Sequence, residues 1–166
     1  METKNKNLYY LEELSDYKVA SDDPDVRGWR VKDVSGRVVG KVDNLLVNKN
    51  TERVVYLDVE LDASVLETNY KPYSKSASNG VHDFINKEGE NHVIIPIGMA
   101  TLNKEDEYVI TNKINHRTFS ETKRFKKSTP LYRDYEVIIL DSYLRDHPVD
   151  EYPEDDTFYD REEFNY

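Results

Sequence analysis

The sequence predicts a mainly β protein: a small antiparallel barrel with a short N-terminal arm, a C-terminal helical extension and an acidic tail. The clearest sign is the run Arg53–Leu61, in which apolar residues occupy every second position, as in a strand with one face in a core. A second sign is the pair Val39 and Val42, since core residues three positions apart face opposite ways in a regular strand. An extra residue at Gly40, as a bulge, would turn both to one face and bend the strand like a barrel corner.

The elements before the clearest strand are short. Leucines recur at helical spacing near the start of the chain and predict an amphipathic arm over residues 1–16. Residues 16–33 fit two short strands, and a tight hairpin turn follows at 34–37, where Gly36 reaches positive φ at low cost. The bent strand then runs over 37–47.

The second half of the predicted barrel follows a long irregular stretch. Residues 62–91 carry no strand pattern and are predicted to be a surface insertion, because such a length is unusual for a connection within one compact domain. A strand then leads into Pro96, which cannot donate to a ladder, so this strand is expected at a sheet edge. Residues 103–106 are predicted to form the turn of a last hairpin.

Beyond Asn112 the strand pattern stops. Residues 118–125 fit one or two helical turns, and the apolar residues of 131–143 approximate a helical stripe, although the run from 137 to 140 alone also fits a strand. The predicted organisation is a 1–16 arm, a 17–116 barrel domain, a 117–145 basic helical extension and a 146–166 acidic aromatic tail.

Charge is segregated along the chain. The tail contains nine acids and one base, a net charge of -8 out of the total of -10. Residues 113–133 contain seven bases and one acid. This basic segment is either a solvated connection or a phosphate or nucleic-acid patch that the tail covers. The overall acidity disfavours nucleic-acid binding, and the sequence leaves open whether the tail is disordered or docks on the body or on a partner.

Several classes of function find no support. The chain has no apolar stretch of spanning length and no secretory leader pattern, so a soluble, cytoplasmic protein is expected. It also has no cysteine, which excludes a disulfide framework, a thiol nucleophile and a thiolate metal site. An EF-hand reading of Asp23–Val34 fails because Arg27 and Val34 stand at ligand places. The four histidines lack the spacing of a zinc helix, and no nucleophile or phosphate-loop motif occurs. No metal, no cofactor and no enzymatic activity are therefore expected.

The segment Val26–Leu61 resembles the PRC-barrel family, the domain named after the cytoplasmic part of the photosynthetic reaction centre H subunit. The likeness lies in Gly28 before a strand, the Ser35–Gly36 turn, the step Gly40–Lys41–Val42 with Asp43, and the strand Val55–Val59. The run 92–111 is similar to the second half of the family's domain, so the likeness covers about 17–111. The resemblance implies a free-standing bacterial member and a protein-contact module; in the reaction centre the domain caps a membrane complex, and in a ribosome-maturation factor a related barrel binds a ribosomal protein.

The leading expectation is therefore a non-enzymatic adaptor of unknown physiological role that presents an edge strand or an outer sheet face to a protein partner, a second copy included. The alternatives are a small-molecule-binding barrel beneath the 62–91 insertion, and a nucleic-acid- or ribosome-associated protein that uses the basic segment. Trp29 is expected to pack on the core or to serve as a recognition aromatic. The candidate partner-binding residues are Trp29, Val54, Tyr56, Lys123, Arg124, Lys126 and Lys127.

Overall fold

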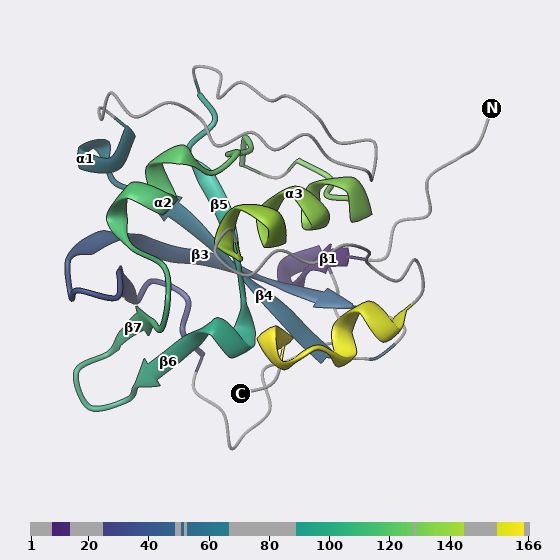
Figure 1. Ribbon diagram of the computed structural model, residues 1–166. Helices are drawn as coiled ribbons and strands as arrows, with labels where there is room; N and C mark the ends of the chain where they lie inside the picture. The colour runs from purple at the N-terminus through teal and green to yellow at the C-terminus, as the bar shows by residue number, and fades with distance from the viewer. Residues whose placement is uncertain are drawn as a thin grey trace.

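A computed structural model describes residues 8–13, 25–48, 51, 53–66, 89–127, 129–144 and 156–164. In this part of the chain seven strands form one mixed sheet in the order β5-β4-β3-β2-β7-β6, and β1 pairs with β3 outside that path (Figure 1). The strands are β1 Leu8–Tyr10, β2 Arg30–Lys32, β3 Val38–Asn48, β4 Arg53–Leu61, β5 His92–Pro96, β6 Ala100–Asn103 and β7 Tyr108–Thr111. The mainly β prediction is confirmed.

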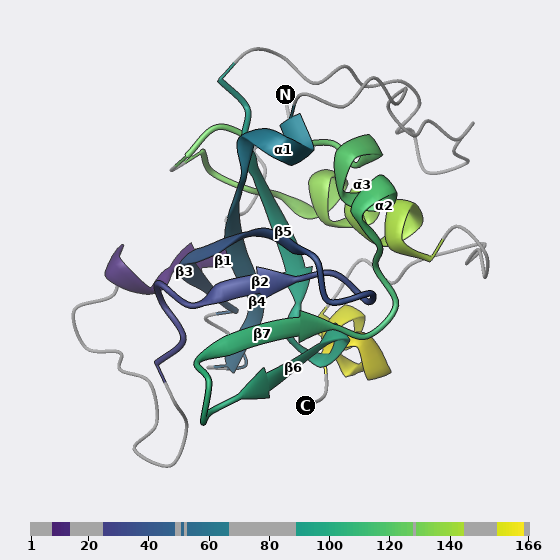
Figure 2. The same ribbon diagram turned by 90° about the vertical axis from the view of Figure 1, so that its left-hand side faces the viewer.

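Short helices surround this sheet. Figures 1 and 2 show α3 lying across one face, with α2 beside it, α1 next to α2, and the two C-terminal turns, η3 and η4, near the start of β6. The helices are α1 Ala63–Leu66, α2 His116–Glu121, α3 Arg133–Tyr143, η1 Leu11–Glu13, η2 Ile97–Met99, η3 Asp156–Asp160 and η4 Glu162–Phe164. None of the helices in the described ranges is long and apolar enough to cross a membrane.

The sheet is mixed and not wholly antiparallel as predicted, because β2 and β7 run parallel. These strands are far apart in the sequence, and a long crossover permits the parallel pairing that a hairpin forbids. The two ends of the strand order, β5 and β6, are consecutive in the chain and joined by η2. Among the described residues no ladder connects β5 to β6, so the sheet is curled without a closed ring of hydrogen bonds.

The predicted bend of β3 is present. Register irregularities of this strand lie at Val39 and Asp43, one residue before and three residues after the predicted position, Gly40. Val39 and Val42 are both buried. The register shifts leave Val39 without a counterpart on β2 and Asp43 without one on β4. Gly40 itself is required by close approach of the neighbouring strand, since a Cβ there would lie 2.1 Å from the carbonyl oxygen of Glu60. The glycine therefore lets β3 and β4 pack together where the strand bends.

Both faces of β4 are buried, which overturns the prediction of an exposed outer face. Tyr56 has 0% exposure, donates a hydrogen bond of 2.8 Å to the Glu136 carboxylate and meets the Phe164 ring edge-on at 5.3 Å. Glu136, on α3, is also fully buried and accepts hydrogen bonds from Tyr159 Oη at 2.6 Å and Arg133 Nε at 3.2 Å. Helix α3 and the C-terminal turns therefore cover the face opposite the main core.

The described parts of both chain ends pack on the body of the fold. Residues 8–10 form a strand on β3, so the helical turn that the leucine spacing predicts is limited to η1, Leu11–Glu13. Of the tail, 156–164 docks on the body, with Phe158, Tyr159 and Phe164 all at 0% exposure. Residues 14–24, residues 67–88 of the predicted insertion and residues 145–155 lie outside the described residues.

Candidate functional site

The β6–β7 hairpin carries the open edge of the sheet. Figures 1 and 2 show it projecting from the rest of the fold, and its turn is fixed by Asn103 Oδ1, which accepts from the Asp106 amide at 2.9 Å. The Asn112 amide donates to the Met99 carbonyl at 3.0 Å. Because bonded pairs alternate in an antiparallel ladder, the backbone groups of Leu102 face away from β7. The hairpin therefore presents unpaired strand groups at its outer edge within the described structure.

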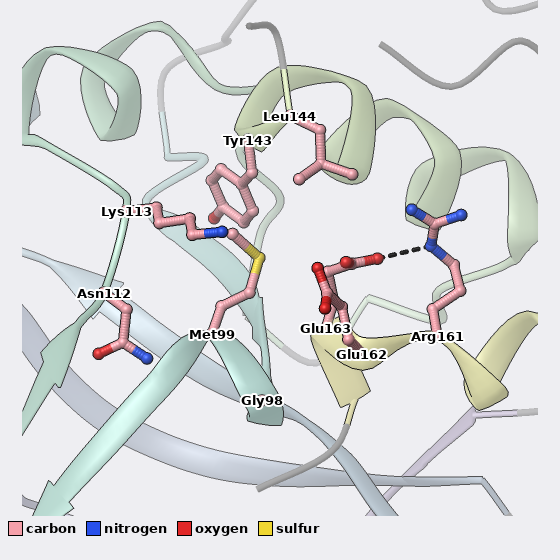
Figure 3. Close-up of a pocket in the computed structure, with 9 residues that line it drawn as sticks. All are labelled: Gly98, Met99, Asn112, Lys113, Tyr143, Leu144, Arg161, Glu162 and Glu163. Atoms are coloured by element: carbon pink, nitrogen blue, oxygen red, sulfur yellow. Dashed lines mark hydrogen bonds and ion pairs between the residues drawn. The ribbon is translucent and has the colours of Figure 1, made fainter. Parts of the chain in front are cut away.

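A pocket of about 540 Å³ adjoins this hairpin, between η2, the end of α3 and η4 (Figure 3). Its floor is anchored by Tyr143, whose hydroxyl donates to the Ile94 carbonyl at 2.8 Å and whose pKa is raised by burial. Arg161 Nε donates to Glu163 at 2.5 Å on the opposite wall. The lining mixes apolar groups with both signs of charge: Gly98, Met99, Asn112, Lys113, Tyr143, Leu144, Arg161, Glu162 and Glu163.

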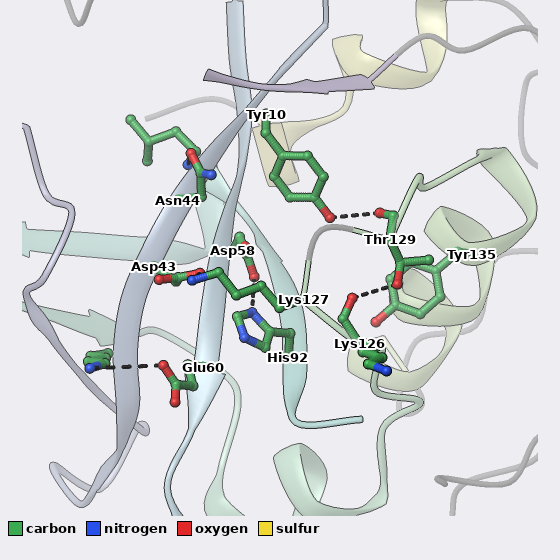
Figure 4. Close-up of polar contacts among 12 residues, drawn as sticks. Tyr10, Asp43, Asn44, Asp58, Glu60, His92, Lys126, Lys127, Thr129 and Tyr135 are labelled. Atoms are coloured by element: carbon green, nitrogen blue, oxygen red, sulfur yellow. Dashed lines mark hydrogen bonds and ion pairs between the residues drawn. The ribbon is translucent and has the colours of Figure 1, made fainter. Parts of the chain in front are cut away.

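A third feature is a polar cluster on the covered face of the sheet (Figure 4). His92 pairs with Glu60 across β4 and β5, which places it diagonal to Asp58 on the same face. His92 Nδ1 lies 2.7 Å from Asp58 Oδ1, and both side chains are almost fully buried. Asp43, the bulged residue of β3, brings its carboxylate within 4.8 Å of both partners, and Lys127 Nζ lies 3.4 Å from it.

The electrostatics of this cluster are dominated by burial. Burial raises the pKa of the Asp58 carboxyl above its ordinary value, while the hydrogen bond and charge of His92 oppose that rise. The negative charge of Asp43 raises the same pKa further, and the ammonium of Lys127 lowers it. The cluster is thus a small concentration of negative charge that holds one lysine against it.

The predicted basic segment is largely tied to the body. Lys123 Nζ pairs with Glu90 at 2.7 Å, and Lys127 pairs with Asp43. Arg124 is half-buried, and Lys126 is exposed. Phe125, between them, bridges to His92 through two backbone hydrogen bonds of 3.0 and 2.8 Å. These four cations therefore do not form one continuous exposed patch, and acids of the body pair with two of them, Lys123 and Lys127.

The remaining predicted contact residues belong to the interior or its margin. Trp29 and Val54 are half-buried and pack against the core, and Tyr56 is fully buried. The sequence reasoning passed over Asp43, Asp58 and His92 as a group. Two signals pointed to them: an acid in the middle of the cleanest strand and a histidine at the start of the next apolar one.

The comparison with protein families identifies a domain that covers most of the described sheet. The model of the PRC-barrel domain family matches residues 18–115, more than half of the chain. Among curated proteins no match was found. The matched range contains the bent β3, the β4–β5 pair and the β6–β7 hairpin, and it ends before α2.

Proposed function

Because this chain belongs to the PRC-barrel family, we propose that it is a non-enzymatic protein-interaction module whose contact surface is the open edge of β6. We infer that the curled sheet is the family's barrel, closed through η2. A cytoplasmic location is part of this proposal. No nucleophile or phosphate-loop motif supports a catalytic role.

The open edge of β6 is the observation that carries the proposal. An exposed strand edge is a template for another strand, and extended segments of partners bind in this way through main-chain hydrogen bonds. The pocket next to Met99 adds a place for a side chain of such a segment, because Met99 directly precedes β6. Edge and pocket together form one surface suited to an extended peptide, from another protein or from a second copy.

A proline substitution at Leu102 tests this surface. Leu102→Pro removes the amide that faces outward and leaves the amides that bond β7 in place. Leu102→Ala is the matched control, since it loses the same packing and keeps the amide. Light scattering over a concentration series measures self-association of the wild type and both variants, and quantitative capture from the protein's own cells measures other partners.

The two variants are expected to differ in self-association or in partner capture. Self-association or partner capture should persist in Leu102→Ala and be lost in Leu102→Pro, with both variants folded by circular dichroism. Equal behaviour of the two variants in both measurements would show that the β6 edge is not the contact surface.

The pocket also supports a second candidate function, binding of a small molecule. Its volume of about 540 Å³ lies in the range of roughly 300–1,000 Å³ typical of ligand sites. Native mass spectrometry of the freshly purified chain should then show an added mass that Met99→Trp, which fills the pocket, abolishes. A wild-type spectrum without added mass would count against this alternative. The nucleic-acid alternative is weaker, because Lys123 and Lys127 are paired with acids.

A further inference from the structure

We propose that Asp43, Asp58 and His92 form a binding site for a divalent transition-metal ion of the Zn²⁺ type, in which the metal takes the place of the Lys127 ammonium. The site lies on the face covered by α3 and is separate from the β6 edge, so it does not depend on the proposed function. Each of the three residues offers one ligand atom, and these atoms all lie within 4.8 Å of one another.

The backbone holds the three ligands on adjacent strands. Asp58 stands in the middle of β4, and the β4–β5 register fixes His92 beside it. Two backbone hydrogen bonds with Phe125, one donated by each residue, hold His92 on its other side. Asp43 joins them only because the bulge of β3 gives it no counterpart on β4. The donor set is therefore built into the sheet and does not depend on a flexible loop.

The chemistry of the donors fits a zinc-like ion. Zinc binds carboxylate oxygen and imidazole nitrogen at roughly 2.0–2.2 Å, and three protein ligands leave a fourth position for water. Two carboxylates balance the charge of a divalent ion. On metal binding, His92 and Asp58 would each bond to the metal in place of the hydrogen bond between them. Any proton held in that hydrogen bond would be released.

Lys127 is the independent sign that this place attracts a cation. Its ammonium already lies 3.4 Å from Asp43 Oδ2, while 63% of its side chain is exposed. It can therefore swing into solvent when a more highly charged ion arrives. If the metal competes with this lysine, removal of the lysine should strengthen metal binding. Adventitious surface binding would not show this gain.

Calorimetric titration of the chelator-treated full-length chain with ZnCl₂ tests the site. The wild type should bind one Zn²⁺ per chain. Asp43→Asn should weaken binding by about tenfold or more, since even loss of an outer-shell partner has an effect of that size. Lys127→Met should tighten it about two- to fivefold, as expected for loss of an exposed ion pair. Glu60→Gln removes the same charge two residues from Asp58 and should change little.

A second measurement keeps the outcome clear if Asp43→Asn folds poorly. Co²⁺ added to the wild type and to Lys127→Met should give the visible absorption of a four-coordinate site with a nitrogen ligand, and His92→Gln should abolish it. The proposal fails if the wild type binds no stoichiometric Zn²⁺. It also fails if Asp43→Asn and Glu60→Gln bind alike while Lys127→Met shows no gain, which would indicate adventitious binding only.

Discussion

The buried carboxylate of Glu136 is the point at which β4, α3 and the C-terminal turns are held together, and Tyr56→Phe tests its role. The substitution removes one hydroxyl and keeps the ring that meets Phe164 at 5.3 Å. Glu136 has 0% exposure and keeps Tyr159 and Arg133 as partners. A hydrogen bond to a charged group contributes about 1.5–3 kcal/mol. We therefore expect the free energy of unfolding to fall by about 2 kcal/mol.

Urea denaturation and thermal melting measure this loss. For a chain of this length, a loss of about 2 kcal/mol lowers Tm by roughly 4–8 °C, and the slope of the urea transition should not change. Tyr108→Phe is the control, because its half-buried ring stacks under Lys32 and the described residues give its hydroxyl no hydrogen bond. Equal stability of the two variants, within about 0.5 kcal/mol, would refute the idea that Glu136 depends on Tyr56.

Two further predictions concern the bend of β3 and the turn before it. Gly40→Ala should lower the free energy of unfolding by about 2 kcal/mol or more, because its Cβ would collide with the Glu60 carbonyl oxygen; wild-type stability in urea would contradict this. Burial alone would raise the pKa of Asp33, but hydrogen bonds from Ser35, Arg37 and His116 hold it below its ordinary value. A carboxyl group with a lower pKa in the folded state than in the unfolded state stabilises the fold at pH values above its unfolded-state pKa. This stabilisation is lost as the pH falls through its folded-state pKa. Asp33→Asn should therefore be less stable than wild type at pH 7. Urea denaturation from pH 7 to about 2 measures this difference in stability, which should shrink below about pH 4. A difference that stays constant over this range would rule out the charge of Asp33 as its cause.

Most of the strands, β1 excepted, were predictable because their signals are local. The alternation of Arg53–Leu61 and the apolar run ending at Pro96 correspond to β4 and β5, and the Gly36 turn and the last hairpin lie where the sequence places them. The helical stripe of 131–143 corresponds to α3. In each case a residue's neighbours within a few positions decide its backbone conformation.

The burial of Tyr56 shows where local signals end. Alternation alone places Tyr56 and Asp58 on the face opposite the core, and it identifies that face correctly. Whether the face meets water depends on α3, whose Glu136 is 80 residues away in the sequence. No periodicity within β4 carries that information, so a buried polar face looks the same as a solvated one.

The sequence by itself determined the family, the mainly β class and the order along the chain of the strands from β3 to β7. Only the tertiary structure decided the parallel pairing of β2 with β7, the docking of the acidic tail through its aromatic residues, and the meeting of Asp43, Asp58 and His92. The physical reason is the range of the interactions. Turns and alternation are set by steric preferences between neighbours, whereas pairing and coverage are set by which distant surfaces bury the most apolar area together.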